Sequence, residues 1–100
     1  MRSRFEVFWS GESILRTDQI LKYISENWTE KEALNFLTDL KSFEEIVSYF
    51  PEIYPKSQIK KGCLRAVINK QTSIIYSIEK GSILIHTLFD NRQNPEKLKK

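Results

Sequence analysis

The sequence predicts an α+β domain in which a helical hairpin packs on one face of an antiparallel sheet. Apolar residues recur every three to four positions over residues 10–50, as they do in amphipathic helices. Strand patterns dominate residues 64–89, and apolar and polar residues also alternate over residues 4–9. A chain of 100 residues can bury one modest core, so we expect a single domain over residues 1–100.

The opening segment has a strand pattern and continues into a helix. Phe5, Val7 and Trp9 alternate with polar residues, which predicts a half-buried strand. Ser10 is a suitable N-cap for the following helix, which should end near Asn27. The apolar residues expected on one side of this helix are Ile14, Leu21, Ile24 and Trp28, with Ile20 and Tyr23 beside them.

A second helix follows after a very short turn. Thr29 and Glu32 form a capping box, in which each side chain can bind a free amide of the first turn. A proline ends the helix because it has no N–H to donate. The apolar stripe consists of Ala33, Phe36, Leu37, Leu40, Phe43, Val47 and Phe50. We expect Leu37, Leu40 and Val47 to be buried against the sheet.

Three strands follow a loop at residues 51–62. The predicted strands are Leu64 to Ile68, Ser73 to Ile78 and Ser82 to Phe89. Their connections are short enough for hairpins, and Gly81 can adopt the positive φ that a tight turn requires. The opening strand should join this antiparallel meander, leaving the second face of the sheet free of helices.

Charge is distributed unevenly, although the net charge is only +3. Residues 26–52 contain seven acids and two lysines, a local balance of −5. Residues 53–78 contain no acid and five basic residues, namely Lys56, Lys60, Lys61, Arg65 and Lys70. A basic segment attracts polyanions such as nucleic acid or an acidic protein segment. A solvated basic loop without a partner is the alternative.

Several protein classes are disfavoured by composition. The sequence has no apolar run of about 20 residues and no signal-peptide pattern at its start, so we expect a cytoplasmic protein without a membrane partner. Cys63 and His86 are the single cysteine and the single histidine. An intrachain disulfide is therefore impossible, and we expect no metal and no cofactor.

Five segments follow one another in a recognisable order. They are Trp9-Ser10, Ile20 to Asn27, Phe50 to Glu52, Ile74 to Ile78, and Leu88 to Leu98. In order and spacing they resemble the RelE/ParE superfamily of toxins from type II toxin–antitoxin operons, over nearly the whole chain. The resemblance implies a two-layer RelE/ParE-like fold and a growth-inhibiting toxin that a cognate antitoxin neutralises.

The resemblance leaves two targets and one further alternative. Members similar to ParE have a longer helical hairpin and are associated with inhibition of DNA gyrase. Members similar to RelE cleave messenger RNA on the ribosome, with basic side chains on the sheet. The predicted helices, about 17 and 20 residues long by their apolar stripes, favour the ParE-like function. A degenerate, non-toxic module that only binds an antitoxin is the third possibility.

The resemblance also assigns roles near the end of the chain. Arg92 stands where many members have a functional arginine or its catalytic neighbour. Asp90 and Asn91 are expected to form the turn that presents it. A guanidinium in this place suits a phosphate or a carboxylate of the target.

The basic loop supplies the other expected binding residues. Arg65 lies near the position where RNA-cleaving members carry a lysine, and Lys60 and Lys61 precede it. We expect these three residues to bind the target or nucleic acid together with Arg92, and Arg65 and Arg92 to share one basic side of the sheet. Ser73 replaces a third basic residue of RNA-cleaving members and cannot neutralise a phosphate. No catalytic residue is assigned, and whether the protein is an enzyme stays open.

The remaining reactive or aromatic residues have structural interpretations. We expect His86 to be a core or partner-contacting residue rather than a base. Neighbouring lysines could activate Cys63, but without a histidine nearby in sequence it is interpreted as a small packing residue. Trp9 and Trp28 are expected to pack in the core or the hairpin rather than to stack on bases.

Overall fold

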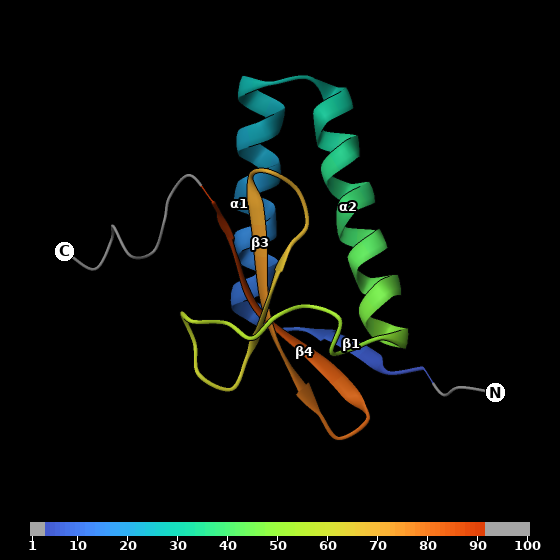
Figure 1. Cartoon of the computed structure of the whole chain (residues 1–100). Helices are drawn as coiled ribbons and strands as arrows, with labels where there is room; N and C mark the ends of the chain where they lie inside the picture. Colours follow the sequence, from blue (N-terminus) through green and yellow to red (C-terminus); the bar gives the residue numbers. More distant parts are fainter. Residues whose placement is uncertain (1–3, 92–100) are drawn as a thin grey trace.

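The structure, a computed structural model, describes residues 4–91 of the chain (Figure 1). Its elements are β1 (Glu6–Trp9), α1 (Gly11–Asn27), α2 (Glu30–Tyr49), β2 (Leu64–Val67), β3 (Thr72–Glu79) and β4 (Ser82–Asp90). The order of helices and strands predicted from the sequence is confirmed. Neither described helix combines the length and the apolar character that crossing a membrane requires.

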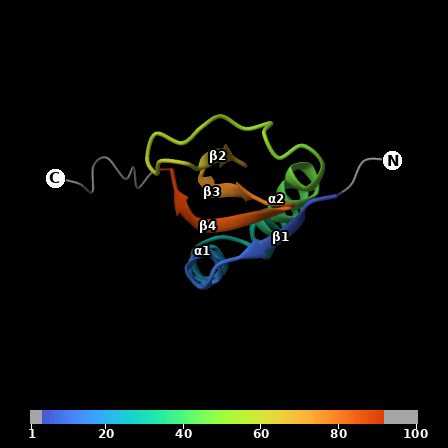
Figure 2. The ribbon, with the colours of Figure 1, turned by 90° about the horizontal axis from the view of Figure 1, so that it is seen from below.

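Four strands form one mixed sheet in the order β1-β4-β3-β2. The antiparallel meander of β2, β3 and β4 is as predicted, with Gly81 at φ 69° in the β3–β4 turn. β1 joins at the edge beside β4 and runs parallel to it, because the hairpin returns the chain across the sheet. In Figure 2, α1 lies on one side of the strands and the 50–63 connection runs on the other.

Side-chain caps fix the beginning of both helices. The Ser10 hydroxyl accepts a hydrogen bond from the Ser13 amide at 3.0 Å, and Thr29 accepts one from the Glu32 amide at 3.2 Å. Each bond satisfies a free amide of the first turn. Ser10 also donates to the His86 carbonyl at 2.8 Å, which ties the start of α1 to β4.

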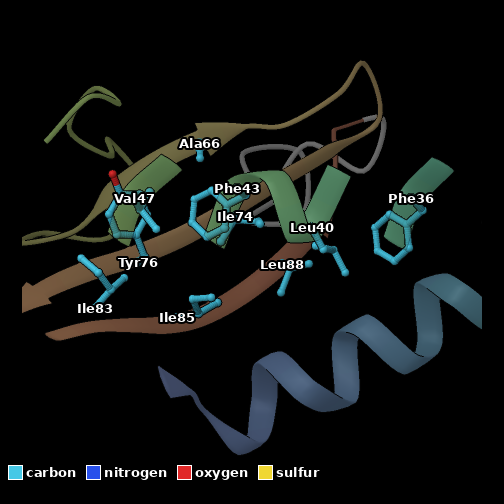
Figure 3. Packing of buried hydrophobic residues seen from close by; sticks show 10 residues of the cluster. All are labelled: Phe36, Leu40, Phe43, Val47, Ala66, Ile74, Tyr76, Ile83, Ile85 and Leu88. Carbon is cyan, nitrogen blue, oxygen red and sulfur yellow. The ribbon is translucent and has the colours of Figure 1, made fainter. Parts of the chain in front are cut away.

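The core lies between α2 and the sheet (Figure 3). Its buried residues include Phe36, Leu40, Phe43 and Val47 from α2 and Ile74, Tyr76, Ile83, Ile85 and Leu88 from the sheet. Phe43 and Tyr76 pack edge to face with ring centroids 5.4 Å apart. The Tyr76 hydroxyl donates to the Pro51 carbonyl at 2.7 Å, so this ring also anchors the loop after α2.

Two apolar side chains predicted to pack in the core or the hairpin are exposed, Leu37 at 43% and Trp28 at 42%. Ile14 and Tyr23, from the apolar pattern of the first helix, are also exposed, at 52% and 49%. Phe36 and Leu40 occupy the sheet-facing side of α2, and Leu37 follows Phe36 after a rotation of about 100°. The assignments of Leu37 to the core and of Trp28 to core or hairpin packing are therefore wrong, whereas Leu40 and Val47 are buried as predicted.

Candidate functional site on the helix-free face of the sheet

The second face of the sheet carries most of the polar chemistry of the strands. Side chains alternate along a strand, so the neighbours of the core residues Ile74 and Tyr76 point to the other side. Cross-strand pairing places the following residues there: Arg65, Ser73, Ile75, Ser77, Leu84 and Phe89. We call this surface the helix-free face.

Arg65 is held in place at one end of the helix-free face. Its Nε donates to the Ser73 hydroxyl at 3.1 Å, and its Nη2 donates to Asn91 Oδ1 at 3.3 Å. The guanidinium carbon lies 5.2 Å from the centre of the Phe89 ring, within cation–π distance. Ser73 also donates to Asn91 Oδ1. Ser73 adds no charge here, but it orients the arginine beside it.

Asn91 connects the end of β4 to the β2–β3 connection. Its backbone amide donates to the Gln71 carbonyl at 2.6 Å, and its side-chain amide donates to the Lys70 carbonyl at 3.2 Å. Asp90 is the last residue of β4 and pairs with Thr72. Asn91 is thus a fixed point from which the chain continues to residue 92.

A second polar group lies nearer the β3–β4 turn. His86 Nε2 is 2.8 Å from the Ser77 hydroxyl, and Ser77 donates to Glu79 Oε2 at 2.7 Å. Because the single Ser77 proton points to the carboxylate, we assign the histidine proton to Nε2, which then donates to Ser77. The register shifts between Ile75 and Tyr76, so His86 has no partner on β3 and occupies the bulge.

Burial favours the neutral forms of the single histidine, His86, and the single cysteine, Cys63. Burial lowers the pKa of His86, and the positive charge of Lys60 lowers it further, while Glu79 and Glu12 oppose the shift. Burial raises the pKa of the Cys63 thiol. Cys63 is buried as a packing residue, as expected, and a protonated thiol is a poor nucleophile.

The basic residues predicted for the site lie in different places. Arg65 joins the network with Ser73 and Asn91, and Lys60 is exposed but close enough to His86 to act on its pKa. Lys61 is exposed on the same loop. Arg92 lies outside the described residues. Within residues 4–91, no group of three histidine, cysteine or acidic side chains is arranged to hold a metal ion.

Sequence reasoning missed Ser77 and Phe89 as members of this surface and Glu79 as the hydrogen-bond partner of Ser77. The alternation within β3 contained a signal, since Ser73, Ser77 and Glu79 are spaced by even numbers of residues. No comparable signal existed for His86, because a bulge depends on the pairing of two strands.

The comparisons with known proteins define the class of the fold. A chain of the chromosomal ParDE TA (toxin–antitoxin) system from P. aeruginosa superposes with a TM-score of 0.74 at 12% identity, covering 87% of this chain and 96% of that one. The conserved hypothetical protein HP0894 from Helicobacter pylori gives 0.59 at 11% identity, covering 88% and 96%. No family model and no curated protein matches the sequence. The chain has the RelE/ParE-like α+β fold, so the sequence resemblance is confirmed for the fold.

Proposed function

We propose that this protein is the toxin of a toxin–antitoxin system, a growth inhibitor that a cognate antitoxin neutralises. The observation that carries the proposal is the fold shared with a chain of the ParDE system over 96% of that chain's length. The organised polar surface around Arg65 adds support, because an arginine held by Ser73 and Asn91 is prepared to bind an anionic group.

We propose inhibition of DNA gyrase as the activity. Helices of 17 and 20 residues form a hairpin that extends past the strands, and this offers a large surface to a protein target (Figure 1). The described part of the helix-free face places one cation, Arg65, between uncharged side chains, with Ser73 and Ile75 beside it. Cleavage of RNA would require more positive charge around the scissile phosphate.

A second candidate is ribosome-dependent cleavage of messenger RNA, which the hydrogen bonds of His86 favour. With its proton on Nε2, the imidazole has a lone pair on Nδ1 that can accept a proton from a ribose hydroxyl. Glu79 acts through Ser77 to hold this tautomer. Arg65 is the described cation of this face, and Lys60, on the loop before β2, is close enough to His86 to lower its pKa.

Purified protein distinguishes the two candidates. In a gyrase supercoiling assay, we expect inhibition by the wild type and by His86→Ala to the same extent. In a parallel reaction with translating ribosomes, we expect messages to stay intact. Ribosome-dependent cleavage that His86→Ala abolishes would replace gyrase inhibition with the second candidate, and absence of both activities would favour a module that only binds an antitoxin.

A further inference from the structure

A groove separates α1 and α2, which lie side by side (Figure 1). Its volume is about 450 Å³, and Ile14 from α1 and Leu37 from α2 are among its lining residues. Both side chains are about half exposed although neither is polar. The groove is separate from the helix-free face, because its lining comes from the two helices and from Trp9 at the end of β1.

Further apolar residues of the hairpin stand at helical spacing from the two that line the groove. Leu21 follows Ile14 by seven residues and therefore falls on the same side of α1, and Trp28, seven residues further, is the C-cap of this helix. On α2, Leu34 precedes Leu37 by three residues and is 63% exposed. We call these five residues the hairpin seam. Exposed apolar side chains beside a groove of a small protein indicate a binding surface.

The shape of the seam fits a third helix. Two antiparallel helices form a groove into which the side chains of another helix can interdigitate. Amphipathic helices bind such grooves through apolar anchors at every third or fourth residue. A nucleic acid does not fit, because its phosphates would meet the carboxylates of Asp18 and Glu44 at the groove.

The charges of the hairpin specify the flanks of that helix. Residues 11–49 contain eight acids and four basic residues, a balance of −4. Asp18 and Glu44 line the groove with one cation, Lys41. Trp9 donates to Glu44 at 2.6 Å and holds that carboxylate in position. The ion pair found among residues 4–91 joins Arg4 and Glu45, so Asp18 and Glu44 have no cation bound to them there.

We propose that the hairpin seam binds an amphipathic helix of a protein partner that carries an apolar stripe flanked by lysine or arginine. The apolar stripe covers Ile14 and Leu37. The basic flanks meet Asp18 and Glu44. This surface serves protein recognition whether or not the helix-free face acts on gyrase or on RNA.

The test uses two labelled synthetic peptides with the same leucine stripe, one with lysine and arginine flanks and one with glutamate flanks. Fluorescence anisotropy with the full chain should show binding of the basic peptide and at least about tenfold weaker binding of the acidic one. The double substitution Ile14→Gln and Leu37→Gln should weaken binding of the basic peptide by about tenfold or more. The circular dichroism spectrum should not change, because both residues are exposed.

Leu15→Gln is the matched control, because Leu15 is 56% exposed on α1 and is not part of the seam. It should change affinity less than about twofold. Binding of neither peptide, equal binding of both, or an equal loss in the control variant would overturn the proposal. The peptide-binding measurement does not depend on growth arrest. A negative binding result therefore leaves the proposed toxin function standing, and a lack of growth arrest leaves the proposed peptide binding standing.

Discussion

Ser73 accepts a hydrogen bond from Arg65 Nε across the β2–β3 pair and donates its own proton to Asn91. The serine is fully buried, whereas the arginine is partly exposed. A buried hydroxyl therefore links the one described cation of the helix-free face to the end of β4. The sequence indicated only that Ser73 replaces a basic residue. In the structure, this serine orients the charged side chain of Arg65.

Ser73→Ala should lower stability by about 1 to 3 kcal/mol, because Arg65 and Asn91 both lose a buried partner. Urea denaturation measures this loss. In NMR spectra, the Arg65 Nε resonance should shift and broaden as the guanidinium loses its fixed orientation. Ser42→Ala is the control, since Ser42 is exposed on α2, and it should change neither property. An unchanged Arg65 resonance in Ser73→Ala would contradict the positioning role.

Leu40→Ala should lower the free energy of unfolding much more than Leu37→Ala, although both residues belong to the apolar stripe of α2. Leu40 is buried against the sheet, and its truncation should cost about 2 to 5 kcal/mol through the cavity that it leaves. Leu37 faces solvent, and its truncation should cost less than about 1 kcal/mol. Chemical denaturation of both variants tests the orientation of the helix, and equal losses would mean that α2 is rotated.

The pKa of His86 predicts a pH dependence of stability. Because the pKa in the folded protein lies below the ordinary value of 6.5, the unfolded chain binds a proton more readily. The contribution of neutral His86 to the unfolding free energy is therefore fully present above about pH 6.5 and is lost as the pH falls through the lower pKa of the folded state. His86→Gln keeps a donor for Ser77 and should flatten the pH dependence of the unfolding free energy in this range. Identical pH profiles for the two proteins would contradict this account.

Local signals in the sequence determined where the elements begin and how the strands follow one another. Ser10 and Thr29 cap the helices as predicted because capping depends on residues three apart. Leu37 was misplaced because periodicity assigns a broad stripe, and only tertiary packing selects which part of it meets the sheet. The bulge at His86 could not be predicted from the sequence, because it depends on how β3 and β4 pair. Arg92, one of the four predicted binding residues, lies outside the described residues.

Arg92→Ala should weaken toxicity more than folding. The residue follows Asn91, which is bonded to Arg65 and to the β2–β3 connection, so the substitution leaves this network intact. Titrated expression should require more inducer for growth arrest, while thermal denaturation should show a change of only a few degrees. A large loss of thermal stability would assign Arg92 to the fold instead of to the target.

The most direct test of the toxin proposal is growth after induced expression of this chain alone in a bacterium, with folded protein verified by fractionation. We predict that growth stops within a few generations and resumes when the protein encoded by the adjacent reading frame is co-expressed. Unimpaired growth at strong expression of soluble, folded protein would contradict the proposal and leave an antitoxin-binding module without toxicity as the function.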